Sequence, residues 1–190
     1  MLSSDLILEN EKVLLRPLSR QDFSLLQALT SDPETWIYFT YDLSVVEEFE
    51  KWAEPHFSGE RLQFTVIEKA TGKVAGSTAF GNFSARDQRI EIGWTWLDRS
   101  QHGTGLNSTI KYLMLKHAFE NWRMVRVQLK TAASNLRSQR AIEKLGAQRE
   151  GVLRNHRRLA DGRLDDTVLY SITDHDWPTI KQQLEARFSG

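Results

Sequence analysis

The sequence predicts an α/β (α+β) fold in which helices flank a mixed, mostly antiparallel central sheet. Segments of strand-like composition alternate with segments that repeat apolar residues at helical spacing. Two pairs of neighbouring strands are separated by glycine turns, Thr71-Gly72 and Asp161-Gly162, which is typical of antiparallel hairpins. No internal repeat or low-complexity linker interrupts the 190 residues. We therefore expect one domain over residues 1–190.

The expected order of elements is β-α-α-β-β-β-α-β-α-β-β, followed by a C-terminal helix. In the first half, a β-prone run at residues 12–16 is closed by Pro17, and Ser19 can cap the helix that follows, which ends at residues 31–33. The segment between this helix and the next, residues 36–41, is unusually aromatic. The other predicted elements of this half are a helix over residues 44–57 and strands over Leu62–Glu68 and residues 73–80.

The second half begins with the strand Arg89–Leu97, in which residue types alternate. The alternation predicts one face made of Ile90, Ile92, Trp94 and Trp96, and an opposite face made of Glu91, Gly93 and Thr95. A turn at residues 100–105 then leads into a helix with apolar positions from Leu106 to Phe119. The later elements are a strand over residues 124–131, a helix over residues 135–145 with Gly146 just beyond its end, strands over residues 152–158 and Leu164–Thr173, and a helix over Trp177–Phe188.

Composition excludes several classes of function. The 25 basic and 25 acidic residues cancel, so no global field favours binding to nucleic acid or to a membrane surface. The absence of cysteine removes disulfides, Cys–zinc sites and thiol nucleophiles. The first ten residues lack the basic start and apolar core of a signal peptide, and no stretch is long and apolar enough to span a membrane. We expect a cytoplasmic protein.

The segment between the strand Arg89–Leu97 and the next helix has the features of an anion-binding turn. Gly103 and Gly105 permit positive φ angles and close approach of the backbone to a ligand. At a helix N-terminus, such a turn directs unpaired amides and the positive end of the helix dipole at a phosphate. A Rossmann site would need glycine where Ser108 stands, and a P-loop would need Gly-Lys-Ser/Thr. A tight connection that binds no ligand remains the alternative.

At this point the chain resembles the GNAT acetyltransferase superfamily, and most closely its RimJ/RimL-like branch of ribosomal-protein N-terminal acetyltransferases. The resemblance rests on several segments in their order along the chain: V-L-L-R-P-L at residues 13–18, E-I-G-W-T-W at 91–96, G-T-G-L-N at 103–107, N-L-R-S-Q-R-A-I-E-K-L-G-A at 135–147 and E-G-V-L-R at 150–154. It implies a GNAT-type fold and a turn that grips the pyrophosphate of coenzyme A.

The cofactor signature of this family is Gln/Arg-x-x-Gly-x-Gly/Ala, and Ser100 departs from its first position. Because main-chain amides hold the phosphates in such sites, the departure does not remove the expectation of acetyl-CoA binding. The resemblance implies no metal. The cofactor contacts expected from it are Leu97, Arg99, Gln101, His102, Gly103, Thr104, Gly105, Leu106, Asn107, Asn135 and Arg140.

The activity that the resemblance implies is transfer of an acetyl group from acetyl-CoA to a primary amine. The amine attacks directly, without a covalent acyl-enzyme, and belongs to a protein N-terminus, an amino acid or a small amine. Glu91 is the expected general base, with Asp165 and Asp166 as second choices. Ser138 resembles the group that stabilises the departing thiolate, and Asn135 the group that contacts the pantetheine arm or an ordered water.

Each of these residues also has a structural interpretation that the sequence leaves open. Asn135 can simply cap its helix. Glu91 can face solvent or pair with Arg89 or Arg126. The rings expected to line the acceptor cleft, Trp36, Tyr38 and Trp94, can instead be ordinary core and surface aromatics.

Further alternatives concern the donor, the acceptor and the partners. The basic residues 154–158 and Arg163 fit an acidic acceptor, the 3′-phosphate of coenzyme A or a solvated strand edge. A succinyl or other acyl donor, or a non-catalytic module that senses coenzyme A, would use the same turn. Homodimerisation is common among similar proteins and is a further expectation.

Overall fold

A computed structural model of the chain describes residues 5–188, so the first four residues of the N-terminal segment and the last two of the predicted domain lie outside it. The described part contains an eight-stranded sheet in the order β1-β2-β3-β4-β5-β6-β8-β7. Every neighbouring pair is antiparallel except β5 and β6, which are parallel. The predicted mixed, mostly antiparallel sheet flanked by helices is confirmed. The expectation of one domain over residues 1–190 stays a prediction.

The elements follow the predicted order, with one short strand at the start that the sequence pattern did not indicate. Ser19 caps the start of the segment after Pro17 as predicted; the element that it caps is a 3₁₀ turn at Arg20–Asp22, and Asp22 completes a capping box with it. The strands are β1 (Leu8–Glu9), β2 (Val13–Pro17), β3 (Leu62–Glu68), β4 (Lys73–Ser84), β5 (Arg89–Leu97), β6 (Arg126–Ala132), β7 (Gln148–Arg158) and β8 (Leu164–Thr173). The α-helices are α1 (Phe23–Gln27), α2 (Val46–Phe57), α3 (Leu106–Lys116), α4 (Leu136–Lys144) and α5 (Trp177–Phe188).

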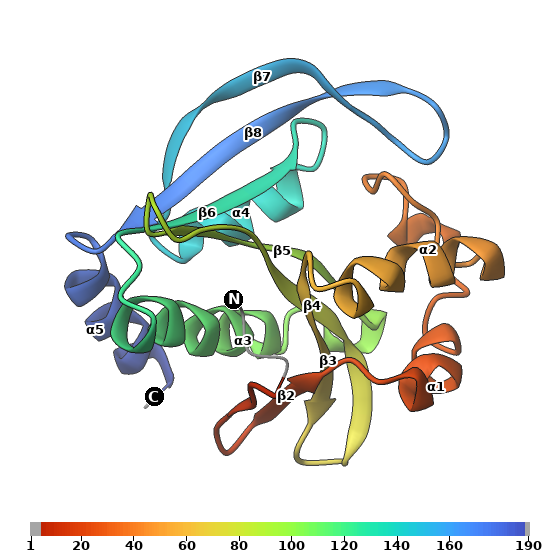
Figure 1. Cartoon of the computed structure of the whole chain (residues 1–190), viewed down its shortest axis with the longest axis horizontal. Coiled ribbons are helices and arrows are strands. Elements are labelled where there is room, and N and C mark those ends of the chain that lie inside the picture. Colours follow the sequence, from red (N-terminus) through yellow and green to blue (C-terminus); the bar gives the residue numbers. More distant parts are fainter. Residues whose placement is uncertain (1–4, 189–190) are drawn as a thin grey trace.

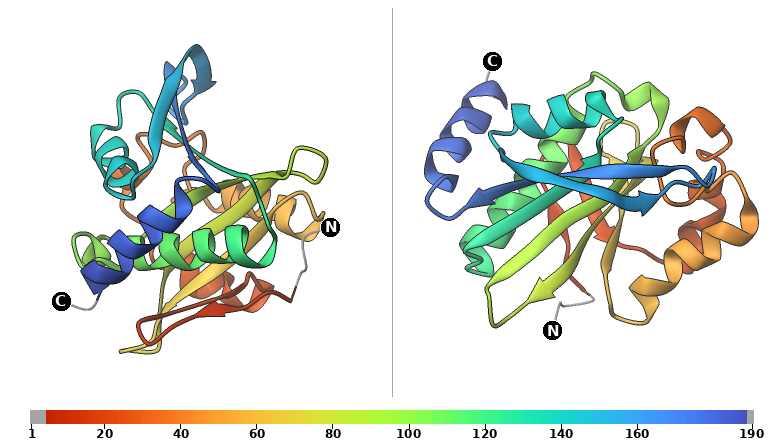
Figure 2. Two further views of the ribbon diagram at one scale, coloured as in Figure 1. Left: turned by 90° about the vertical axis from the view of Figure 1, so that its left-hand side faces the viewer. Right: turned by 90° about the horizontal axis from the view of Figure 1, so that it is seen from above.

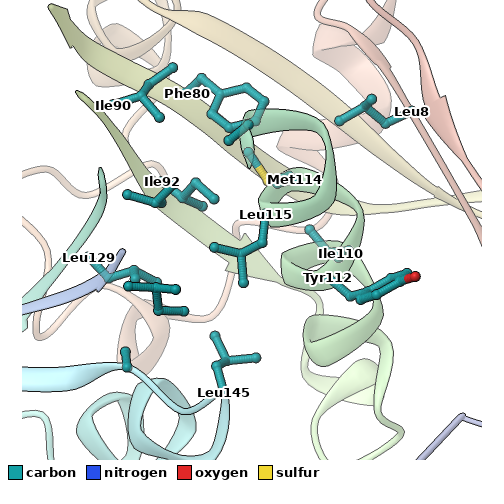
Figure 3. Close-up of a cluster of buried hydrophobic side chains, with 14 of the residues drawn as sticks. Leu8, Phe80, Ile90, Ile92, Ile110, Tyr112, Met114, Leu115, Leu129 and Leu145 are labelled. Atoms are coloured by element: carbon teal, nitrogen blue, oxygen red, sulfur yellow. The ribbon is translucent and has the colours of Figure 1, made fainter. Parts of the chain in front are cut away.

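Helices cover both faces of the sheet, as the two turned views show (Figure 2). The larger core lies between the sheet and helices α3, α4 and α5, and the smaller core lies under α1 and α2. In the larger core, Ile110, Met114 and Leu115 of α3 lie against apolar strand residues (Figure 3). Burying each such side chain stabilises the fold by roughly 1.5–3 kcal/mol relative to exposure. The α3 helix that follows the turn is therefore held firmly on the sheet.

A bulge in β5 contradicts the predicted alternation of its residues. Ser77 pairs with Trp96 and Ala79 with Gly93, so two residues of β5 oppose the single residue between them on β4. Trp94 has a φ angle of 51° at this bulge. A strict period of two assumes one residue per position, and the extra residue reverses the faces beyond it. Trp96 therefore joins the core under α1 and α2 rather than sharing the face of Ile90 and Ile92.

The parallel strands β5 and β6 separate soon after they begin. Their pairing joins residues 89–91 to residues 126–128, although β5 continues to Leu97 and β6 to Ala132. Their carboxyl ends are thus unpaired with each other, at the edge where the turn to α3 and the start of α4 both lie. The divergence is visible in Figure 1.

The long β7–β8 hairpin reaches across the molecule toward α1 and α2 (Figure 1). At its tip, the amide of Ala160 donates a hydrogen bond to the carbonyl of Phe39, 2.9 Å away. The hairpin and the aromatic segment 36–41 are therefore joined, although they lie more than 100 residues apart in the sequence. The tip of the hairpin thus contacts the segment that the sequence predicts to line the acceptor cleft.

Candidate active site

The turn between β5 and α3 has the geometry expected of an anion-binding site. Gly103 and Gly105 have φ angles of 81° and 87°, and Gly105 is the residue that precedes the helix. Among residues 5–188, the amides of Gly103, Gly105, Asn107 and Ser108 have no hydrogen-bond acceptor. These amides stand at the positive end of an 11-residue helix. The turn therefore presents several free N–H groups to a phosphate.

A contact that the sequence did not predict links this turn to α4. Nη1 of Arg137 lies 3.2 Å from Nδ1 of His102. Burial lowers the pKa of His102, and the charge of Arg137 lowers it further. Arg99 points elsewhere, because its guanidinium pairs with Asp32 at 3.2 Å and with Glu34 at 3.6 Å. Arg137 is the second residue of α4, and nothing in the sequence distinguishes it from Arg140.

The other predicted cofactor contacts fall into two groups. The side chains of Leu97 and Leu106 are buried in the core, so these residues can contact a ligand only through their main-chain atoms. Buried side-chain oxygens of Gln101 and Asn107 have no hydrogen-bond donor among the described residues. Both oxygens are shielded from solvent, so the main-chain amides are the groups that the turn presents to a ligand. Thr104 hydrogen-bonds within the turn, and Arg140 is exposed on α4.

Asn135 and Ser138 open α4 beside the same edge of the sheet. Oδ1 of Asn135 accepts a hydrogen bond of 3.0 Å from the amide of Ser138, so Asn135 caps the helix. Within the described chain, neither Nδ2 of Asn135 nor Oγ of Ser138 has a hydrogen-bond partner. Capping therefore leaves the amide group Nδ2 of Asn135 and the hydroxyl of Ser138 free for a ligand.

Glu91 is buried on the sheet face that α1 and α2 cover. Its Oε2 accepts hydrogen bonds from Nδ2 of Asn82 at 2.7 Å and from Nζ of Lys130 at 2.8 Å. The partners considered from the sequence are engaged elsewhere: Arg89 lies near Asp87, and Arg126 pairs with a glutamate on β7. No donor among residues 5–188 reaches Oε1 of Glu91.

A cavity of about 410 Å³ opens beside this carboxylate. Charged and polar side chains from β4, β5, β6 and β7 line the cavity, among them Asn82, Arg89, Gln128, Lys130 and His156. A carboxylate with one free oxygen in a cavity of this size can receive a proton from a small bound amine.

The second-choice carboxylates hold loops rather than a reaction space. Oδ2 of Asp165 accepts a hydrogen bond of 2.5 Å from Oγ of Ser134. Oδ1 of Asp166 accepts one of 2.7 Å from the amide of Asn155. Both side chains thereby fix the connection into α4 and the bend of β7, which makes Glu91 the better base candidate.

The three predicted acceptor-lining rings differ in their surroundings. Trp36 is 1% exposed, and its indole donates to the carbonyl of Thr30, so it supports the cleft from within the core. Tyr38 is half-buried on the aromatic segment. Trp94 lies against Gly81, where an added Cβ would come within 2.6 Å of the indole. Because Gly81 pairs with Glu91, the bulge brings Trp94 to the face of the candidate base.

Among residues 5–188, no group of three or more His, Cys, Asp or Glu side chains is placed to hold a metal ion. No helix in this part of the chain combines the length and apolarity needed to cross a bilayer.

Comparison with known proteins gives matches over most of the chain. Residues 12–148 match the family described as the acetyltransferase (GNAT) domain. The chain is 27% identical over 175 residues to the uncharacterized N-acetyltransferase p20 of Bacillus licheniformis, and the alignment covers 90% of this chain and 97% of that protein.

Solved structures with the same fold agree. A GCN5-related N-acetyltransferase from Brucella melitensis has a TM-score of 0.89 and 29% identity, covering 97% of this chain and 86% of that one. RimJ from Mycobacterium smegmatis, solved in complex with CoA-disulfide, has a TM-score of 0.78 and 21% identity over 92% of this chain and 88% of its own. At that identity, the second likeness concerns the fold.

Proposed function

We propose that this chain, which belongs to the GNAT acetyltransferase family, transfers an acetyl group from acetyl-CoA to a primary amine. The observation that carries the proposal is the turn with two positive-φ glycines and free amides at the start of α3. It lies at the edge where β5 and β6 separate, and Glu91 lies where they are still paired.

The residues of the turn fit the pyrophosphate of coenzyme A. Free amides and the helix dipole would hold its negative charges. Arg137 would add positive charge from α4. The complex of RimJ with CoA-disulfide supports this assignment, because RimJ shares the fold.

The proposed chemistry assigns one role to each of three side chains. Bound acetyl-CoA supplies an activated thioester carbonyl. The free Oε1 of Glu91 takes a proton from the acceptor ammonium, directly or through a water molecule, so that the neutral amine can attack. Oγ of Ser138 donates a hydrogen bond to the departing sulfur, and Nδ2 of Asn135 orients the thioester arm. No covalent acyl-enzyme is involved.

A thiol-release assay tests the proposal. Purified protein is mixed with acetyl-CoA and a panel of amino acids, amino-terminal peptides and small amines, while calorimetry measures coenzyme A binding. We expect thiol release that depends on an amine. Tight binding of coenzyme A without turnover for any acceptor would favour the non-catalytic sensing module instead.

The same calorimetry separates the possible acyl donors. If acetyl-CoA binds no better than coenzyme A while succinyl-CoA binds clearly better, the donor is the larger acyl group. The acceptor class, the cytoplasmic location and the homodimer stay predictions.

A further inference from the structure

A buried arginine lies on the acceptor side of the sheet without a carboxylate partner. Arg61 is 8% exposed, and its Nη2 donates a hydrogen bond to the carbonyl of Trp52. Its Nε has no hydrogen-bond acceptor among the described residues, and no carboxylate in that part of the chain forms an ion pair with it. Burial lowers the pKa of Arg61, and the charges of Tyr41 and Glu60 oppose this effect without forming an ion pair with it in the described chain. A buried guanidinium that forms no ion pair is costly, and such a group calls for an anionic partner.

Other buried polar groups surround this guanidinium. The hydroxyl of Tyr41 and the indole N–H of Trp52 are buried; the indole acts on the phenol as a hydrogen-bond donor, and neither group has another side-chain partner in the described chain. Burial raises the pKa of Tyr41, and the charge of Arg61, the Trp52 indole and the charge of Arg157 oppose that rise. Together, Tyr41, Trp52, Arg61 and Arg157 form a donor cluster.

Arg157 connects the donor cluster to the candidate base. The bulge at Asn155 lets two successive residues of β7, His156 and Arg157, hydrogen-bond the same hydroxyl of Thr167, at 3.0 and 2.9 Å. His156 lines the cavity beside Glu91, whereas the charge of Arg157 interacts with Asp165, Glu91 and Tyr41. Neither terminal nitrogen of the Arg157 guanidinium has a hydrogen-bond partner among residues 5–188.

Trp94, at the bulge of β5, also connects the candidate base to the donor cluster. Trp94 lies over Gly81, which pairs with Glu91, and the guanidinium of Arg61 lies 5.0 Å from the centre of the Trp94 ring. The candidate base and the donor cluster are thus connected along two routes, through β7 and through the β5 bulge. Glu91 offers negative charge at one end of this region, and the two guanidinium groups offer positive charge at the other.

We propose that the acceptor is a primary amine that carries a carboxylate a few bonds from its nitrogen, with the amine at Glu91 and the carboxylate at Arg61 and Arg157. The proposal rests on the proposed acetyl transfer and specifies its substrate class. Two sources share this chemistry: a free amino acid, and a peptide whose acidic side chain lies near its N-terminus. A polyamine is disfavoured, because its second ammonium would meet two buried or half-buried guanidinium groups.

The test compares matched acceptors in the thiol-release assay with the full chain. The panel contains L-amino acids, their α-carboxamides, tripeptides with Asp or Asn at the second position, and spermidine. We expect kcat/KM for the acid to exceed that for its matched amide by about tenfold or more, since an unmatched buried charge disfavours the analogue that lacks its partner. The free acids and the Asp tripeptides separate the two sources.

Variants assign the preference to the cluster. In Arg157→Gln the acid-to-amide ratio should fall at least about fivefold, mainly through KM for the acid, whereas Arg149→Gln, an exposed site on the same strand, should keep the ratio. Arg61→Gln should act in the same way. Because Arg61 also donates a hydrogen bond to the carbonyl of Trp52, the result for Arg61→Gln counts only if this variant keeps the coenzyme A affinity of the wild type. If Arg61→Gln does not fold, Arg157→Gln alone decides.

Failure of the inference and failure of the proposed function give different results. Turnover without preference for acids, or with preference for amides or spermidine, overturns the inference and leaves acetyl transfer intact. If no acceptor reacts, binding of the acids and amides to the coenzyme A complex is measured instead, by titration followed through Trp fluorescence, and this binding decides whether the inference holds. Binding of acids alone, lost in Arg157→Gln, supports the cluster. Equal or absent binding of both overturns it.

Discussion

The two glycines of the turn carry the cofactor assignment at the scale of single residues. At Gly105 the φ angle of 87° lies in the left-handed region, and a Cβ there would meet no atom within 4 Å. A substitution therefore strains the backbone without a steric clash, at a cost of about 1–2 kcal/mol. We expect Gly105→Ala to weaken coenzyme A binding at least about tenfold, because relief of the strain turns the amides away from the phosphates.

The chain contains a matched control for this effect. Gly162, in the β7–β8 turn, has a φ angle of 86° and equally open surroundings. Gly162→Ala should lose similar stability in urea unfolding while it keeps wild-type coenzyme A affinity in calorimetry. If both variants bind coenzyme A like the wild type, the phosphates are held elsewhere.

Glu91 tests the assignment of the base. Glu91→Gln keeps the size of the side chain and its contact with Asn82 but removes the proton acceptor. We expect kcat to fall about 10²–10⁴-fold, as for loss of a general base, with an unchanged coenzyme A dissociation constant. Rate measurements across pH should also show partial recovery at high pH, where the free amine is already neutral.

Glu150→Gln is the control for loss of an ion pair. Glu150 pairs with Arg126 on the same sheet, and that hydrogen bond lowers its pKa to about 2. Its variant should lose a little stability and keep its activity. Wild-type kcat in Glu91→Gln would exclude Glu91 as the base.

At the scale of elements, α3 carries a buried lysine beneath the bulge of β5. Nζ of Lys111 donates to Oγ1 of Thr78 at 3.3 Å and also to Oγ1 of Thr95, a residue of the bulge. Burial lowers the pKa of Lys111 to about 7. The helix that presents the turn is thereby tied to the strand that presents Trp94 and Glu91.

This lysine predicts how stability depends on pH. An unfolded lysine titrates near pH 10.4, so between about pH 7 and 10.4 the unfolded state binds more protons than the folded state. The free energy of unfolding should therefore rise with pH in this window, by at most about 1.4 kcal/mol per pH unit. Below pH 7 both states are protonated, and the full destabilisation by the buried charge persists.

Urea unfolding of the wild type and Lys111→Met at pH 6.5, 8 and 9.5 checks this prediction. The variant should be more stable at pH 6.5, because it buries no charge and because Thr78 and Thr95 still hydrogen-bond each other. Its difference in stability from the wild type should shrink as the pH rises, because Lys111 of the wild type loses its charge. Lys73→Met, on an exposed strand end, should parallel the wild type. Parallel curves for Lys111→Met would show that Lys111 does not titrate in this range.

The sequence was informative where a structural signal is local. The capping box at Ser19 and the glycine turn before α3 depend on neighbours within three or four residues, and the structure contains both. The bulge at Trp94 left no such signal, because an extra residue in one strand is defined only by its partner strand. The partner of Glu91, Lys130, lies 39 residues away on β6 and could not be identified before the strands were paired.

At the scale of the whole molecule, three connections meet where β5 and β6 separate. The turn to α3 and the start of α4 follow the carboxyl ends of these strands, and the contact of His102 with Arg137 joins them. The β7–β8 hairpin adds the third side by crossing to the aromatic segment. Arg61 and Arg157 show the limit of sequence reasoning at this scale. The interaction of their charges with Tyr41 arises only from the folded chain.

The hairpin tip provides a prediction that separates the acceptor side from the cofactor side. Leu159 is 3% exposed and precedes Ala160, whose amide reaches the carbonyl of Phe39. Leu159→Ala should remove roughly 2–4 kcal/mol of local packing. The tip should then open more often, so that KM for the acceptor rises severalfold while the coenzyme A dissociation constant stays unchanged.

Amide hydrogen exchange provides the independent readout, because opening of the tip exposes the amide of Ala160. Its exchange should accelerate in Leu159→Ala and not in Leu164→Ala, where the side chain is 52% exposed. Faster exchange together with an unchanged acceptor KM would mean that the tip does not shape the acceptor site. Faster exchange together with a raised acceptor KM places the acceptor between the hairpin and the sheet, where the charges of Arg157 and Glu91 interact.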